Sequence, residues 1–252
     1  MKKLAYVLSI SLLMLASSCN DDSNAIETSA VEITFDNRIA ANQDLTLGTT
    51  VYVNQNNESV VTNELKYIIS NLALTQDNGA VFEYPKDDSY FVINEENASS
   101  LTLSLTGIPV GNYTQISFGI GVDQSKYPLD GGVLNFIPTA EEAGMLWTWA
   151  AGYKFIKFEG TYTPQGGTEA PFVIHVGSHG QNLDNYKFVT LPLANTLNIT
   201  TGNTASVTVA AYIQNIIDAT NQIKFEETSD IQVDPVNAPR IATNLETTFS
   251  AH

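Results

Sequence analysis

The sequence predicts an all-β fold, an antiparallel β-sandwich of Ig-like or Greek-key type with few short helices. Apolar residues alternate with other residues in short runs, for example at 31–35, 51–53, 101–105 and 207–211. A period of two is typical of β-strands. Segments rich in glycine, proline and asparagine separate the runs at the spacing of antiparallel hairpins.

Individual elements can be placed on this pattern. Asn78-Gly79 predicts a tight hairpin turn between strands at 72–75 and 80–84. Helical spacing occurs at only three places, which are 139–143, 214–217 and 238–249. No internal repeat and no obvious linker interrupts the pattern, so we expect residues 31–252 to form a single domain.

The first 30 residues predict export rather than folding. Residues 1–18 combine Lys2 and Lys3 with an apolar stretch and small residues before Cys19, as in a lipoprotein signal peptide. The apolar stretch is shorter than the roughly 20 residues of a membrane-spanning helix. We expect Cys19 to be lipidated, and residues 19–30 to form a flexible tether. An ordinary secretory signal with an incidental cysteine is the alternative.

The lipidation of Cys19 has a chemical consequence. Cys19 is the only cysteine, so the folded domain is expected to contain no disulfide and no thiolate metal ligand. The acidic run Asn20-Asp21-Asp22 resembles the surface-export signal of Bacteroidota lipoproteins. We therefore expect an outer-membrane lipoprotein that lies outside the cytoplasm, on the periplasmic or the surface face.

The charge of the chain excludes one class of partner. The formal net charge is −16, and it becomes −18 without Lys2 and Lys3. Such acidity argues against nucleic acid and anionic surfaces, and leaves cationic or metallic partners open. The alternative is that this negative charge simply keeps an exported protein soluble.

The three histidines are unevenly placed. His175 and His179 lie within five residues, and His252 is the last residue of the sequence, without an assigned role. Neutral imidazole is the commonest metal ligand. In an extended chain the two Cα atoms would lie about 13 Å apart, so 177–178 must turn the chain if both rings bind one ion. The alternative is one histidine at a strand edge and one in a solvated turn.

Both tryptophans, Trp147 and Trp149, stand in one short segment. Strand spacing places their indoles on one face, above which small residues leave space. They could stack a ligand ring, offer a cation–π face or undergo oxidation, and ordinary aromatic core is the alternative.

Motifs of common enzymes are missing from the sequence. It contains no phosphate-binding glycine loop, no His-Glu-x-x-His, no Gly-x-Ser-x-Gly and no cysteine nucleophile. A hydrolase that uses His175 or His179 with Ser178 or a carboxylate has the least support. We expect a binding protein rather than an enzyme.

Several blocks together resemble the MbnP-like family, and they stand in the family's order. Segment 241–244 and Phe249 resemble its C-terminal segment. The block with both tryptophans (144–149) and the block with His175 and His179 (172–180) are, in combination, specific to the family. The blocks are LKYIISN (65–71), IPVGNY (108–113), ISFGIGVD (116–123), GMLWTW (144–149), GY (152–153), KFEG (157–160) and FVIHVGSHG (172–180).

The resemblance implies an extracytoplasmic β-sandwich that binds copper, as Cu(I) or Cu(II). In methanotroph members, histidines and a kynurenine hold the copper, and a partner di-haem cytochrome c peroxidase-like protein makes the kynurenine from tryptophan. Carried over, the resemblance makes Trp147 and Trp149 candidates for modification. It makes His175 the first ligand candidate and His179 the second.

One departure touches the expected site. Methanotroph members have a histidine shortly after the glycine and valine that correspond to Gly121 and Val122, whereas this chain continues with Asp123 and no histidine. The cysteines that follow their histidine block are missing too. A cell-surface adhesion module that binds a ligand such as a glycan through the tryptophans, with structural histidines, is the alternative function.

Overall fold

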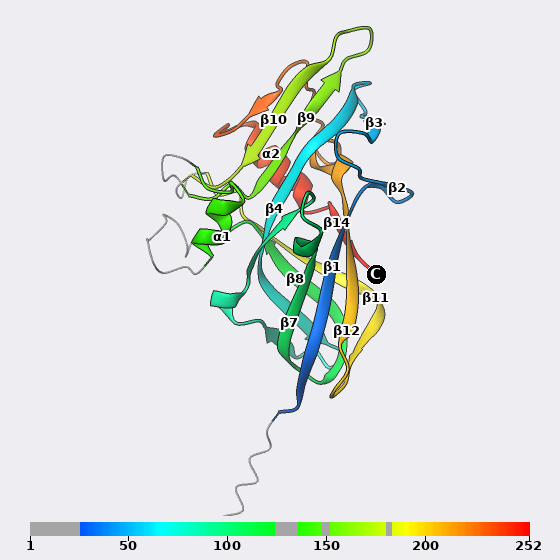
Figure 1. The fold of residues 1–252 in the computed structure, drawn as a ribbon, viewed down its shortest axis with the longest axis vertical. Helices are drawn as coiled ribbons and strands as arrows, with labels where there is room; N and C mark the ends of the chain where they lie inside the picture. The colour runs from blue at the N-terminus through cyan, green and yellow to red at the C-terminus, as the bar shows by residue number, and fades with distance from the viewer. Residues whose placement is uncertain (1–25, 124–135, 148–151, 180–182) are drawn as a thin grey trace, which may run out of the picture.

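The computed structural model describes residues 26–123, 136–147, 152–179 and 183–252, and its strands confirm the all-β class (Figure 1). The leader, Cys19 and Trp149 lie outside the described residues. The strands are β1 (Thr28–Ala40), β2 (Gln43–Asp44), β3 (Val51–Val53), β4 (Ser59–Gln76), β5 (Val81–Glu83), β6 (Tyr90–Asn94), β7 (Thr102–Pro109), β8 (Gly111–Ile120), β9 (Ile156–Thr163), β10 (Ala170–Val176), β11 (Lys187–Ile199), β12 (Ala205–Tyr212), β13 (Asp230–Ile231) and β14 (Phe249–Ala251).

The strands form two halves that are joined at one place. In the β4 half the order is β13-β10-β9-β4-β8-β11, and β3, β5 and β6 also pair with β4. In the β1 half the order is β14-β12-β1-β2, and β7 also pairs with β1. A single register pair, Leu193 with Ala251, links β11 to β14. The narrow link lets the two halves face each other across a common core.

Most pairings are antiparallel as expected, but three are parallel. They are β1 with β12, β10 with β13, and β11 with β14. These partners lie far apart in sequence, and alternation of apolar residues identifies a strand without identifying its neighbour. Strand β1 also begins at Thr28, which pairs with Pro109 of β7, inside the stretch expected to be tether.

The predicted hairpin and helices are found with one change. Thr75 pairs with Val81 around the Asn78-Gly79 turn, and Gly79 has a φ of +87°. The expected helices correspond to α1 (Ile137–Glu142), the 3₁₀ helix η4 (Ile213–Ile216) and α2 (Asn237–Leu245). The third prediction was too long, because Phe249 enters strand β14 and the core. Short 3₁₀ helices also occur at η1 (Lys86–Asp88) and η2 (Ala98–Ser100).

Strand β4 exchanges one neighbour for another at its midpoint. Residues up to Tyr67 pair with β9, and residues from Ile69 onward pair with β8. Strand β6 pairs with 66–70 throughout this change, so β9 and β8 share the opposite edge of β4. At Ile68 the edge is divided: its N–H donates to Phe155 O at 2.9 Å, and its carbonyl accepts from Gly121 N at 2.9 Å. Residues 121–123 therefore leave the sheet, and residues 152–155 return to it, between two strands that follow each other along β4.

An aromatic cluster joins the two halves in the core. Phe35 of β1 contacts Tyr67 of β4 and Phe118 of β8, with ring centroids 6.1 and 5.8 Å apart. Phe249 of β14 contacts the same Tyr67 and Phe118 at 5.7 and 5.3 Å. All four contacts are edge-to-face, the arrangement that aromatic quadrupoles favour. This packing across the halves is what makes the fold a sandwich.

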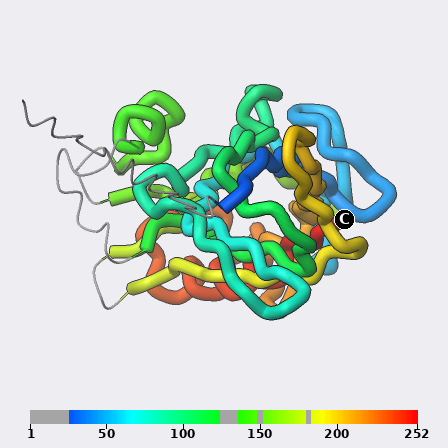
Figure 2. Tube along the Cα trace, turned by 90° about the horizontal axis from the view of Figure 1, so that it is seen from below, coloured from blue at the N-terminus to red at the C-terminus, as the bar shows by residue number. Residues whose placement is uncertain are grey.

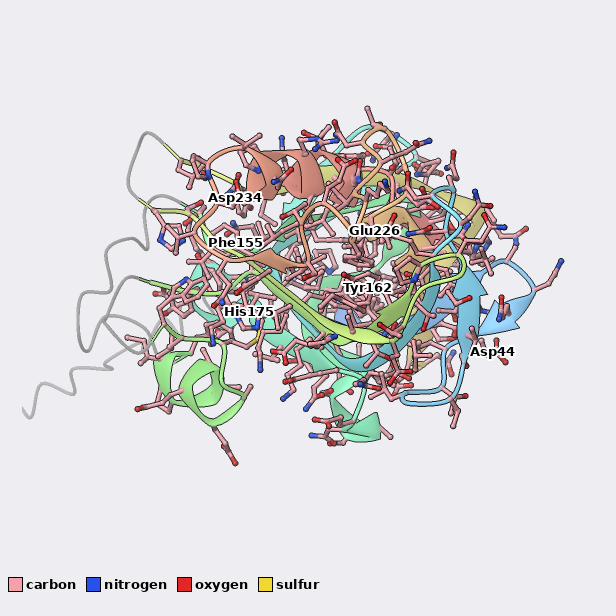
Figure 3. All side chains as sticks on the ribbon, turned by 90° about the horizontal axis from the view of Figure 1, so that it is seen from above. Asp44, Phe155, Tyr162, His175, Glu226 and Asp234 are labelled. Carbon is pink, nitrogen blue, oxygen red and sulfur yellow. The ribbon has the colours of Figure 1, made fainter. Side chains whose placement is uncertain are left out.

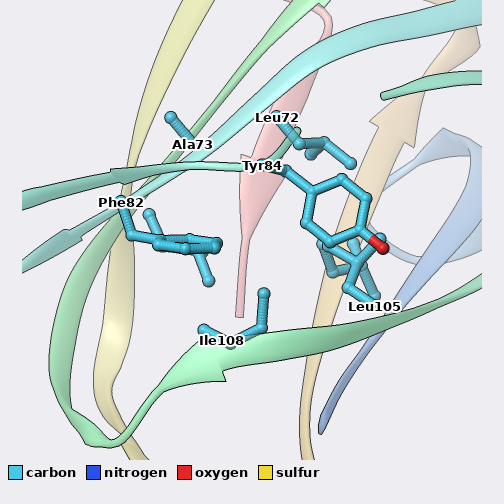
Figure 4. A pocket seen from close by; sticks show the side chains of 8 residues that line it. Leu72, Ala73, Phe82, Tyr84, Leu105 and Ile108 are labelled. Atoms are coloured by element: carbon cyan, nitrogen blue, oxygen red, sulfur yellow. The ribbon is translucent and has the colours of Figure 1, made fainter. Parts of the chain in front are cut away.

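A small apolar pocket lies where the β4–β5 hairpin meets β7 (Figure 4). Apart from the Tyr84 hydroxyl, its lining is hydrocarbon, supplied by side chains such as Leu72, Phe82 and Ile108. It carries no charged or metal-ligating side chain, and it belongs to the core rather than to a site.

No helix among the described residues is long and apolar enough to cross a membrane. Helix α1 and the C-terminal residue lie on opposite sides of the molecule in both ribbon and trace views (Figure 2). The side that carries α1 is the one on which residues 121–123 leave the sheet and residues 152–155 return to it.

The aromatic cluster yields a stability prediction. Phe118→Ala should lower the free energy of unfolding by about 3–5 kcal/mol, because it removes a fully buried ring from the contact between the halves. Urea denaturation of the soluble domain measures this. Phe188→Ala is the control, since Phe188 is 51% exposed and its loss should change stability by less than about 1 kcal/mol. Equal effects of the two substitutions would contradict the assigned core.

Candidate functional site

The chain that leaves the sheet after β8 is hydrogen-bonded to itself and to β10 just before it re-enters the sheet at β9. Leu146 and Tyr153 form an isolated antiparallel bridge, and Trp147 N donates to Gly152 O at 3.1 Å. Phe155 N then donates to Val176 O at 2.6 Å, which attaches the loop to the end of β10. These hydrogen bonds bring Trp147 against the histidine block, although Trp147 and His175 are 28 residues apart in the sequence.

Gly177 permits the close contact between the two blocks. A Cβ atom at this position would overlap the carbonyl oxygen of Tyr153 and would lie 3.2 Å from Trp147 Nε1. Only glycine allows a neighbouring chain to approach so closely. Gly177, which the sequence predicted as part of a turn, is therefore also the position at which the two blocks pack together.

The Trp147 indole lies against both histidines. Its centroid is 5.8 Å from the His175 ring and 5.5 Å from the His179 ring. Trp147 is only 4% exposed, and His175 is 9% exposed. The site lies on the side of the molecule that carries α1, where Figure 3 labels His175. One indole is therefore a shared neighbour of both imidazole rings.

His175 has a polar neighbour at each ring nitrogen. Its Nε2 lies 2.6 Å from Glu159 Oε1, and its Nδ1 lies 3.3 Å from Gln232 Oε1. Burial lowers the pKa of His175 below its ordinary value, and the hydrogen bond with Glu159 opposes this shift only in part. The ring is therefore neutral at pH 7 and above, which is the form that binds metals.

His179 has a different environment. Its backbone N–H donates to Leu183 O at 2.9 Å, but its buried Nε2 has no hydrogen-bond partner in the part of the chain that the structure describes. Burial lowers the pKa of His179 as well. A buried ring nitrogen without a partner costs free energy unless something binds it. The nearby Ser178 hydroxyl donates to Asp184 Oδ1 at 2.8 Å.

Charged side chains alternate on the sheet face beside the site. Lys157 of β9 donates to Glu64 of β4 at 2.8 Å and lies 3.5 Å from Glu159. Glu64 also accepts from Lys66 at 2.7 Å. The register places Lys157 opposite both Lys66 and His175. Each charge thus lies diagonally beside an opposite one across the strands.

A further cation lies over the indole. Lys154 Nζ is 5.2 Å from the centroid of the Trp147 ring, within the range of a cation–π interaction. It also donates to Gly144 O at 3.1 Å. Burial lowers the pKa of Lys154, and the neighbouring Lys157 lowers it further.

The donor set fits an ion that binds imidazole and accepts few ligands. No group of three or more His, Cys, Asp or Glu side chains in the described ranges could hold a metal ion. A metal bound here would therefore use the two imidazoles and a ligand of another type. The observation that supports such a ligand role is the buried Nε2 of His179, for which the described ranges supply no hydrogen-bond partner.

The other residues that the sequence singled out lie away from the contact of Trp147 with the two histidines, or lie outside the described residues. Asp123, which follows the Gly121-Val122 pair, accepts from Lys86 Nζ at 2.5 Å and Asn71 Nδ2 at 3.1 Å. Trp149 and the residues after Asp123 lie outside the described ranges. His252 is exposed, and its Nε2 lies 2.9 Å from Ser250 Oγ.

Sequence reasoning did not identify three neighbours of the site, Lys154, Glu159 and Gln232. Glu159 had a usable signal, since the turn at 164–167 sets the register of β9 against β10 and brings this carboxylate beside His175. No sequence signal placed Gln232 beside His175, because Gln232 follows the two-residue strand β13, whose parallel pairing with β10 has no local pattern.

Comparison with known proteins was made at the level of family, sequence and fold. The family model described as MbnP matches residues 28–236. No curated protein matches the chain. Among solved structures, MbnP from Methylosinus trichosporium is similar with 14% sequence identity and a TM-score of 0.48, covering 76% of this chain and 78% of that one. Because the family model spans most of the sequence, including both the tryptophan and the histidine blocks, this chain belongs to the MbnP family.

Proposed function

We propose that this protein binds a single copper ion outside the cytoplasm, for copper acquisition, storage or delivery. Membership of the MbnP family supports a copper-related role. The observation that carries the proposal is the contact of one indole with two neutral imidazoles, one of which has a buried nitrogen that finds no hydrogen-bond partner among the described residues. Nothing in this proposal requires catalysis, and the protein acts as a binding protein rather than an enzyme.

Copper suits these ligands better than Ca²⁺ or Mg²⁺ does. Cu(I) accepts few ligands and binds imidazole well, whereas Ca²⁺ and Mg²⁺ prefer several oxygen ligands. His175 and His179 would hold the ion. We include the Trp147 side chain as the third component because it contacts both rings.

We take the Trp147 side chain, which contacts both histidine rings, as the candidate for oxidation to kynurenine by a partner di-haem peroxidase. Oxidation there would create a ligand next to both histidines. Trp149 stays a candidate on sequence grounds alone.

The glycan-binding alternative has less support at Trp147. A sugar stacks on an accessible aromatic face, but this indole is 4% exposed and its surroundings include two imidazoles and Lys154. Burial of this kind favours a small ion over a ring-sized ligand.

The copper proposal predicts a specific loss of affinity. Untagged domain should bind one Cu(I) ion in competition with a chelator. A His175→Ala, His179→Ala variant should bind more than about 100-fold more weakly, since loss of an outer-shell partner alone typically costs 10–100-fold. His252→Ala is the matched control, because this exposed histidine lies outside the site. Equal affinity of the double variant and the unmodified domain would refute the proposal.

The modification of tryptophan predicts a mass change. Protein purified from its native host should contain a peptide around 147–149 that carries the mass difference between tryptophan and kynurenine. Fragmentation should locate the change at Trp147. Protein produced in a host without the peroxidase should show unmodified tryptophan, and native protein with two intact tryptophans would exclude this ligand.

The expected lipid anchor gives a prediction for location. Cys19→Ala should move the protein from the membrane fraction to the soluble fraction, because acyl chains rather than a helix would hold it. Mass spectrometry of the mature N-terminal peptide should show acyl chains on Cys19. A mature N-terminus elsewhere, or a Cys19 peptide without lipid, would contradict the anchor.

A further inference from the structure

We propose that Glu159 is a positioning residue, which holds His175 in the Nε2–H tautomer and so leaves Nδ1 as the nitrogen with a free lone pair. The inference deepens the proposed copper site, on which its functional meaning rests. It identifies the nitrogen that would face the metal and the residue that selects it.

The hydrogen-bond distances around the ring support this assignment. The contact of Nε2 with Glu159 Oε1 is 2.6 Å, a short charge-assisted hydrogen bond. The contact of Nδ1 with Gln232 Oε1 is longer, at 3.3 Å. Glu159 therefore decides the orientation and protonation of the ring, and Gln232 is easily displaced.

The chemistry of the two acceptors gives the tautomer. A neutral imidazole carries one N–H, and an ionised carboxylate can only accept. The proton must therefore lie on Nε2, between the ring and Glu159. The Gln232 amide presents its oxygen to Nδ1 because its nitrogen donates to Asp230 Oδ1 at 2.9 Å. An amide oxygen gains no hydrogen bond from an unprotonated Nδ1, so this side of the ring is available to a ligand.

The sheet itself holds the Glu159 carboxylate in place. Lys157 lies 3.5 Å from Glu159 Oε1 and is fixed in turn by Glu64 at 2.8 Å. The register of β9 against β10 sets His175 opposite Lys157, two residues from Glu159 along the same face. Because strands place side chains more precisely than loops do, the carboxylate is a rigid partner for the ring.

A carboxylate that accepts from the distal nitrogen of a metal-binding histidine fixes the ring and raises its basicity. The two neighbours of His175 should then have opposite effects on metal affinity. Removal of Glu159 should weaken binding, while removal of Gln232 should leave binding unchanged or strengthen it. A merely structural role would not separate the two residues in this way.

The tautomer is tested first without copper. Nitrogen-15 shifts of the histidine rings, measured at pH 8 on the metal-free domain, should show His175 as the Nε2–H tautomer. Glu159→Leu should produce a mixture of tautomers, and Glu159→Gln should retain most of the Nε2–H form because its amide oxygen can still accept. An unchanged tautomer in Glu159→Leu, or an Nδ1–H ring in the unmodified domain, would overturn the proposal.

Copper affinity is tested second, with the same chelator competition. Glu159→Leu should weaken Cu(I) binding about 10–100-fold, and Glu159→Gln should weaken it less. Gln232→Ala should bind at least as tightly as the unmodified domain. Glu32→Gln is the matched control, since it removes an exposed carboxylate from strand β1 of the other half without touching His175, Glu159 or Lys157, and it should leave affinity unchanged. Equal losses for all variants would contradict a positioning role.

The two measurements separate the two hypotheses. An unmodified domain that binds no Cu(I) would refute the copper function, yet the nitrogen shifts of the metal-free protein would still decide the tautomer. A domain that binds Cu(I) with a tautomer independent of Glu159 would refute the positioning role alone.

Discussion

The candidate site depends on the exchange of neighbours along one edge of β4. Strand β9 pairs with the first part of that edge and β8 with the rest, and Ile68 hydrogen-bonds to Phe155 and Gly121 at the point between them. The chain between β8 and β9 must leave the sheet here and return beside its own starting point. Because β10 pairs with β9, the end of β10 is carried to the same place. The topology therefore brings the tryptophan and histidine blocks together before any side chain is considered.

Two glycines make that meeting sterically possible. Gly121 has a φ of +99°, and a side chain there would overlap the Phe155 ring. Gly177 allows the Tyr153 carbonyl and the Trp147 indole to approach the turn after β10. The resulting burial lowers the pKa of both histidines, which keeps them neutral. The contacts that exclude water therefore also maintain the imidazole lone pairs, which the proposed copper site requires.

The local parts of this arrangement could be predicted from sequence, and the long-range parts could not. Period-two alternation identified the strands, and Asn78-Gly79 identified its hairpin, because both depend on adjacent residues. The turn at 164–167 also contains enough information to align β9 with β10 and to place Glu159 beside His175. The parallel pairings carry no such local signal, and the Gln232 contact depends on one of them. The contact of Trp147 with both rings likewise follows from the division of the β4 edge at Ile68.

The distribution of charge around the site bears on the ion it can accept. The chain is strongly acidic overall, with a formal charge of −16, yet Lys154 lies over the Trp147 indole and Lys157 and Lys66 lie nearby on the sheet. The acids Glu64 and Glu159 pair with the two sheet lysines and also attract Lys154, which lies on the face of the indole. The charge of Lys154 opposes any second cation near that ring, and the Coulomb energy of this repulsion is twice as large for a divalent ion as for a monovalent one. For the proposed copper site this repulsion favours Cu(I) over Cu(II), because the two imidazoles are neutral and add no charge of their own.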